Sequence, residues 1–169
     1  MKKVIKGRAY VLGDNLDTDQ IYPGQYLELV EARDIGQHAM EGADPDFAQV
    51  FQPGEIIVGG TNFGCGSSRE HAAIALQAVG AGVILAESFA RIFYRNAINL
   101  GLPMLVSPKI SSQVSSGDTL IVDLAKGVVQ NLGTGVELRA EPMSAYVFDI
   151  LESGGIKPLV RKQLASLND

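Results

Sequence analysis

The segment Asn62–His71 contains the side chains of this sequence that are best suited to chemistry. Two glycines and two serines stand directly before a predicted helix that begins near Ser68. The free N–H groups and partial positive charge at the beginning of a helix stabilise an anion such as a carboxylate. Arg69 adds a fork of donors that matches a carboxylate and would favour a nearby alkoxide. The pattern predicts an anion-binding pocket in which Ser67 or Ser68 is a candidate base or nucleophile.

A purely structural interpretation competes with this one. The two serines are also good helix caps, and Glu70 or His71 would complete such a cap. Cys65 lies near His71 in sequence, but a histidine inside the helix would face away from a cysteine in the loop. We therefore expect Cys65 to be a small packed thiol and His71 to be a hydrogen-bonded core histidine.

Other motifs of catalysis and ion binding do not fit. No Gly-Lys-Ser/Thr follows the glycines as a phosphate-binding loop requires, and no Gly-x-Ser-x-Gly elbow is present. The acidic run Asp14–Asp19 lacks the glycine and final glutamate of a calcium loop, so it is either a solvated turn or a source of orienting carboxylates. Arg91 and Arg95 share one helix face, which either is an ordinary polar face or supports the serine loop or a partner subunit.

Composition excludes several classes of function. The chain has 169 residues and a net charge of −5, which argues against binding to nucleic acid or to an anionic membrane. Its single cysteine cannot form an internal disulfide or a cysteine-ligated metal site, so no metal or cofactor is expected in this chain. No signal peptide or apolar run of membrane-spanning length is present. We expect a cytoplasmic protein.

The secondary structure that must position these residues follows from hydrophobic periodicity and from glycine and proline positions. Residues 14–33 are predicted to form an irregular loop. The rest of the chain is predicted to form short strands and helices. Strands are predicted at 4–12, 55–58, 83–86, 103–106, 119–124, 127–130 and 136–139. Helices are predicted at 34–41 (capped by Asp34), through 72–79, at 89–100 (capped by Ser88), at 144–153 and at 156–166.

Strands and helices alternate over residues 55–106, which predicts a parallel sheet. From Gly117 onward, short strands separated by glycines predict an antiparallel meander. The expected fold class is α/β with a partly parallel sheet in a single domain.

Three motifs in this order resemble the aconitase superfamily, in particular its mobile swivel domain: Asp14–Ile21, Gly60–Ala72 and Ser88–Asn96. The resemblance spans residues 4 to about 160, and a stand-alone chain of this length is similar to the small subunits of isopropylmalate dehydratases. It implies one swivelling β/β/α domain over residues 1–169. It also implies a large dehydratase subunit as partner, which carries a [4Fe–4S] cluster and most catalytic residues.

The resemblance also implies roles for individual residues. Ser67 matches the family's catalytic base, which removes a proton from carbon. Ser68 and Arg69 match residues that bind a substrate carboxylate. Asp19 matches a carboxylate that partners an active-site histidine of the large subunit. The implied reaction is the reversible dehydration and rehydration of a small hydroxy-dicarboxylate, as in leucine biosynthesis.

The family's specificity segment reads Tyr-Leu-Glu-Leu-Val at residues 26–30 of this chain. Relatives that act on homoaconitate-type tricarboxylates carry arginine directly after Tyr-Leu, where this chain has Glu28. Leu29 and Val30 would meet an alkyl group, which favours isopropylmalate and leaves citramalate and dimethylmalate as alternatives. Arg33 would have to supply the charge for a tricarboxylate. The predicted substrate contacts of this segment are Tyr26, Leu27, Glu28 and Leu29.

A different class of function is an anion-binding or regulatory module without an enzymatic partner. The intact Ser-Ser-Arg run and Asp19 favour the enzyme, since a binding module has no use for a basic serine.

Overall fold

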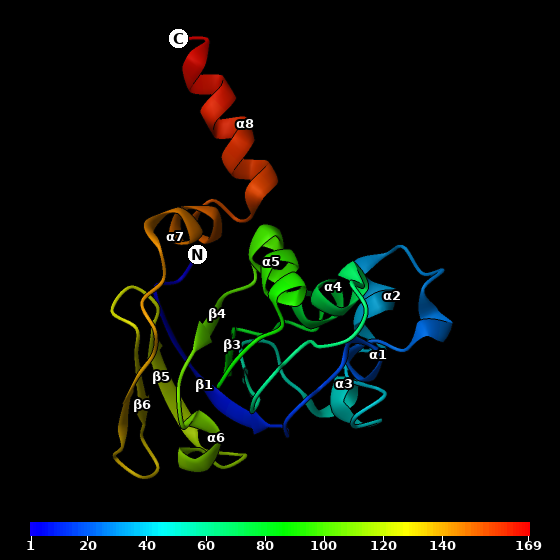
Figure 1. The fold of residues 1–169 in the computed structure, drawn as a ribbon, viewed down its shortest axis with the longest axis vertical. Coiled ribbons are helices and arrows are strands. Elements are labelled where there is room, and N and C mark those ends of the chain that lie inside the picture. Colours follow the sequence, from blue (N-terminus) through cyan, green and yellow to red (C-terminus); the bar gives the residue numbers. More distant parts are fainter.

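A seven-stranded mixed sheet organises the computed structural model, which describes residues 1–169 (Figure 1). Its strands are β1 (Val4–Val11), β2 (Ile56–Val58), β3 (Val83–Ala86), β4 (Met104–Val106), β5 (Thr119–Asp123), β6 (Val128–Asn131) and β7 (Glu137–Arg139). They lie in the order β4-β3-β2-β1-β5-β6-β7. Strand β1 pairs in parallel with β2 and in antiparallel with β5, so it joins a parallel half to an antiparallel half. The predicted α/β class with a partly parallel sheet is confirmed.

The burial of the strands explains why the sequence predicts them well. Every residue of β2 and β3 is buried, as expected for parallel strands covered on both faces. Strand β5 instead alternates between buried and partly buried residues, as in an antiparallel strand with one wetter face. All seven strands lie within one or two residues of the predicted bounds.

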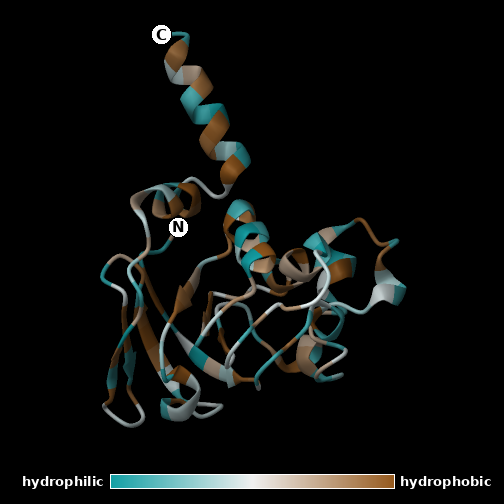
Figure 2. Ribbon diagram, viewed as in Figure 1, coloured by the Kyte–Doolittle hydropathy of each residue, from teal (hydrophilic) through white to brown (hydrophobic).

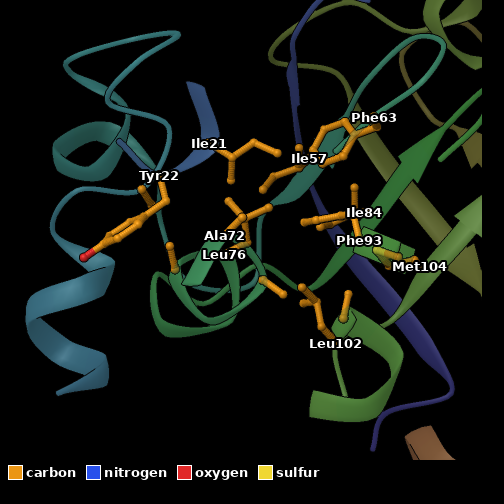
Figure 3. Packing of buried hydrophobic residues seen from close by; sticks show 14 of the residues in the cluster. Ile21, Tyr22, Ile57, Phe63, Ala72, Leu76, Ile84, Phe93, Leu102 and Met104 are labelled. Atoms are coloured by element: carbon orange, nitrogen blue, oxygen red, sulfur yellow. The ribbon is translucent and has the colours of Figure 1, made fainter. Parts of the chain in front are cut away.

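Helices cover both faces of the parallel half. They are α1 (Thr18–Ile21), the 3-10 turn η1 (Gly24–Tyr26), α2 (Ala32–Gly36), α3 (Phe47–Val50), α4 (Glu70–Ala78), α5 (Arg91–Leu100), α6 (Ile110–Gln113), α7 (Ala145–Glu152) and α8 (Ile156–Leu167). In the larger core cluster, helices α1 through α5 pack against one face of the sheet. In the smaller cluster, α6 packs against the other face. Figure 3 shows side chains of α4 and α5 against those of β2 and β3.

The C-terminal helix α8 extends away from the body of the molecule (Figure 1). Hydrophobic and hydrophilic residues alternate along its visible surface in Figure 2. None of the helices combines the length and apolar composition needed to cross a membrane.

Residues 14–33, predicted to be irregular, contain α1, η1 and the beginning of α2. Helix α1 forms because the Asp17 carboxylate accepts from Gln20 N (2.8 Å) while the Gln20 side chain accepts from Asp17 N (3.0 Å). This reciprocal cap satisfies two backbone donors and stabilises even one helical turn. The helix predicted at 34–41 is shorter and earlier, and Asp34 does not cap it.

Two predicted helix starts are wrong in ways that matter for the site. Helix α4 begins at Glu70 rather than near Ser68. Helix α5 begins at Arg91, and Ser88 does not cap it. The Ser88 hydroxyl instead accepts a hydrogen bond from Asn62 N at 2.7 Å, so it ties two loops together.

Candidate active site

The loop that carries the two serines is held from one side by the segment that follows β1. Three backbone hydrogen bonds join residues 15–18 to residues 61–65, although the two segments are nearly 50 residues apart in sequence. They run from Asn15 N to Thr61 O, from Gly64 N to Leu16 O and from Thr18 N to Cys65 O, at 2.7–2.8 Å. Because buried backbone donors and acceptors are paired here as in a sheet, the loop has a fixed path.

Gly64 allows the same loop to press onto helix α5. Its φ is +84°, and a Cβ built there would lie 2.2 Å from Cγ of Phe93. The Phe63 ring lies beside the ring of Phe93 at 5.4 Å and that of Phe89 at 5.7 Å. Figure 3 shows Phe63 and Phe93 among the packed side chains. The loop is therefore anchored to the core directly before the serines.

Ser67 and Ser68 are both exposed and lie outside α4. The residue that precedes the helix is Arg69, and no side chain caps this end. The interpretation of the serines as helix caps is therefore wrong. Ser67 Oγ lies 3.1 Å from the hydroxyl of Thr18, a residue that the sequence reasoning missed.

Arg69 is held in place by acceptors on the opposite segment. Its Nη1 donates to Asp19 Oδ1 at 2.7 Å and to the Tyr22 carbonyl at 3.3 Å. Gly24 lies against the guanidinium, since a Cβ there would approach Nη2 to 3.2 Å. The pair is partly open to solvent, where an ion pair adds little stability. Its effect is to fix the direction of the guanidinium against residues 19–24.

Asp19 is thus a partner of Arg69 within this chain. The resemblance implied a histidine of the large subunit as its partner, and that role stays a prediction. Both hydrogen bonds to Asp19, from Arg69 and from Gly24 N, go to Oδ1. The second oxygen, Oδ2, remains available to a partner residue.

The Arg69 hydrogen bond, followed by that of the Gly24 N–H, lowers the pKa of Asp19 below its ordinary value. Because the pKa is lowered in the folded state, the ion pair stabilises the fold at neutral pH. This stabilisation is lost as the pH falls through the pKa of Asp19. We expect Arg69→Gln to raise the pKa of Asp19 in a carboxyl NMR titration. The pKa should stay somewhat low, since the Gly24 N–H remains.

Asp118 provides the matched control for this titration. Its pKa is also lowered, by the Ser115 N–H and the Asn131 side chain, with no arginine involved. It should titrate identically in the wild type and the variant. An unchanged pKa of Asp19 in Arg69→Gln would contradict the pairing.

The predicted specificity segment is fixed at its first residue. The Tyr26 hydroxyl donates to Glu41 at 2.6 Å, and its ring stacks on that of His38 with 3.6 Å between centroids. Leu29 packs against the larger core cluster. Leu27 and Glu28 are exposed. The structure gives Tyr26 an anchoring position, and substrate contacts from these four residues stay predictions.

The remaining candidate side chains are not joined to the serines. The His71 ring stacks on that of Tyr22 at 5.5 Å, which agrees with a packing role, but no hydrogen bond of its side chain is found. The Cys65 thiol is partly buried and free. Arg91 and Arg95 are exposed and make no hydrogen bond or ion pair with the loop, so support of the loop by this helix face is not found.

The candidate site is an open surface. Ser67 and Ser68 are exposed and Arg69 is partly buried, so the loop is open to solvent at the two serines. No group of three or more His, Cys, Asp or Glu side chains is arranged to hold a metal ion. A small anion could therefore reach both serine hydroxyls from solvent.

A parallel sheet extended by an antiparallel meander, with a Gly-rich serine–arginine loop beside the first strand, defines the class of this protein. The chain belongs to the family of the aconitase C-terminal domain, whose model matches residues 8–109. Within it, the chain is 51% identical to 3-isopropylmalate dehydratase small subunit 1 of Methanopyrus kandleri, over 96% of each chain.

Two further relatives define the range of similarity. The chain is 49% identical to the methanogen homoaconitase small subunit of Methanothermobacter thermautotrophicus, over 92% of this chain and 90% of the relative. The crystal structure of a 3-isopropylmalate dehydratase (leuD) from Methanocaldococcus jannaschii superposes with a TM-score of 0.93, at 38% identity and 98% coverage of both chains.

Proposed function

We propose that this chain is the small subunit of a 3-isopropylmalate dehydratase, a hydro-lyase that interconverts 2- and 3-isopropylmalate in leucine biosynthesis. The observation that carries the proposal is the pair of exposed serines, Ser67 and Ser68, next to the partly buried Arg69, with hydroxyls that are not used as helix caps. The near-full-length similarity to a subunit of that name supports it.

In the proposed reaction Ser67 is the base. Its Oγ, as the alkoxide, takes the proton from the carbon next to the one that bears the hydroxyl. The C–O bond breaks, and the departing hydroxide takes a proton from an acid of the partner subunit and leaves as water. Water then adds with its oxygen on the carbon that lost the proton and gives one proton back to that acid, while Ser67 returns its proton to the carbon that lost the hydroxyl. Substrate and product therefore have the same composition. Arg69, oriented by Asp19, and Ser68 hold one substrate carboxylate.

The enzyme requires a large partner subunit. The open geometry of the site supports this, since a substrate bound at Ser67 needs a second wall to exclude water. We assign the [4Fe–4S] cluster to the partner, because this chain has a single cysteine and no metal-binding group of side chains. When bound there, the cluster supplies a Lewis acid that polarises the departing hydroxyl.

The substrate is an alkyl malate in this proposal. Of the two residues expected to meet the alkyl group, Val30 is exposed, whereas Leu29 packs against the core. Leu27 is also exposed, and Glu28 would repel a third carboxylate. A homoaconitate-type tricarboxylate is the second candidate, favoured by the 49% identity to a homoaconitase small subunit. The negative charge of Glu28 opposes binding of a tricarboxylate.

The test is turnover by this chain after anaerobic reconstitution with its large subunit, on isopropylmalate, citramalate, dimethylmalate, homocitrate-type acids and citrate. We expect isopropylmalate to have the highest kcat/KM. Glu28→Arg should shift the preference toward the tricarboxylates by roughly tenfold or more, since a charge-assisted hydrogen bond contributes about 1.5–3 kcal/mol.

Glu31→Arg is the matched control, because it makes the same charge change at an exposed residue beyond the segment. It should leave the preference unchanged. Tricarboxylate preference in the wild type would overturn the substrate assignment. Binding of these acids without turnover, with the large subunit present, would favour the non-catalytic anion-binding module.

A further inference from the structure

The hydroxyl of Thr18 has a position that the helix containing it does not explain. Thr18 is only 2% exposed, although it lies at the beginning of a short surface helix. The cap of α1 is provided by Asp17 and Gln20, so the threonine hydroxyl is not needed there. The one hydrogen-bond partner of this hydroxyl is Ser67 Oγ, at 3.1 Å.

Because the Thr18 side chain is buried, its hydroxyl depends on Ser67 Oγ as a hydrogen-bond partner. A buried hydroxyl without a partner is costly, so Thr18 Oγ1 is held to its only partner, Ser67 Oγ. The backbone on both sides is fixed as well, because Thr18 N donates to Cys65 O at 2.8 Å. Gly66, directly before Ser67, has a φ of +97°, a conformation that favours glycine at this turn of the loop.

We propose that Thr18 is a positioning residue for Ser67, which donates its hydroxyl proton to Ser67 Oγ when that oxygen acts as the base. Either hydroxyl can donate in the neutral pair. Once the Ser67 oxygen is an alkoxide it can only accept, so Thr18 must be the donor. A charge-assisted hydrogen bond of this kind stabilises the anion and aims its free lone pairs toward solvent, where a substrate would lie.

The proposal rests on the proposed function and is tested by kinetics of the reconstituted complex. Thr18→Val keeps the shape of the side chain and removes the donor. We expect kcat on isopropylmalate to fall roughly 10- to 100-fold, the value of one charge-assisted hydrogen bond, with KM within about twofold. The primary deuterium isotope effect on kcat, for substrate labelled at the carbon that loses the proton, should rise.

Thr18→Ser is the matched control, because it retains a hydroxyl at the same position. It should recover most of kcat and the wild-type isotope effect. A structural role would lower the amount of active complex, and kcat would then fall with an unchanged isotope effect. That result, or a wild-type kcat in Thr18→Val, would overturn the inference.

The outcomes separate this inference from the function on which it rests. A wild-type complex without dehydratase turnover would refute the proposed function. Full turnover by Ser67→Ala would refute Ser67 as the base, and with it the role of Thr18. Normal catalysis by Thr18→Val, alongside an inactive Ser67→Ala, would refute the role of Thr18 alone.

Discussion

Replacement of Ser67 by alanine should lower kcat of the reconstituted complex by roughly 10²–10⁴-fold, the range measured for loss of a general base. The free energy of unfolding of the small subunit should fall by no more than about 1–3 kcal/mol, the cost of leaving the buried Thr18 hydroxyl without its partner. The Ser67 side chain itself is exposed and caps no helix. Steady-state kinetics and urea unfolding of the same preparations measure both quantities. A large loss of kcat in a variant that remains folded identifies a reacting group.

Two other serines provide comparisons. Ser68→Ala should act mainly on KM, since Ser68 is assigned to carboxylate binding. Ser112→Ala, at an exposed serine on α6, should leave both kinetic parameters unchanged. If Ser67→Ala kept more than a tenth of wild-type kcat, another group would have to remove the proton.

Gly64→Ala adds a single methyl group to the site and should strongly lower both stability and turnover. Its φ of +84° costs an L-residue about 1–2 kcal/mol, and the new Cβ would lie 2.2 Å from the buried Phe93 ring. Overpacking of a core adds about 1–3 kcal/mol. We expect a total loss of about 2–5 kcal/mol in the free energy of unfolding, together with loss of turnover, because the displaced loop carries Ser67.

Gly117→Ala is the control that measures the conformational part of this effect without the steric part. Gly117 has a similar φ of +93°, but a Cβ there would meet nothing within 4 Å. Its cost should be limited to the conformational term of about 1–2 kcal/mol. Equal losses of stability in the two variants would show that contact with Phe93 does not hold the loop.

The sequence predicts the sheet well because the strands are short apolar runs bounded by glycines. It does not reveal that β1 belongs to both halves, since pairing with β2 and with β5 depends on the register of distant segments. The missed helix α1 did have a local signal. Asp17 and Gln20 have the spacing of a reciprocal cap. The polar composition of the segment instead favours a loop, which is why the helix was not predicted.

The site was predictable in its residue types and not in its contacts. Glycines, serines and an arginine before a helix indicate an anion site from local chemistry alone. The bond of Thr18 to Ser67 and that of Asp19 to Arg69 join residues 49 and 50 positions apart, and no local pattern encodes such distances. The predicted start of α4 is too early because tertiary hydrogen bonds hold the loop up to Cys65, and Arg69, whose backbone is extended, directly precedes the helix.

The place of β1 at the centre of the sheet affects how the chain is made. Its partner β5 follows more than 100 residues later, which at 5–20 residues per second is a delay of roughly 5–20 seconds during translation. Throughout that time one edge of β1 is open to pairing with other nascent chains. Lys6 and Arg8, both exposed on this strand, place positive charge on the open edge. Charges at such positions discourage association between chains, so they protect the growing polypeptide until its own partner strand arrives.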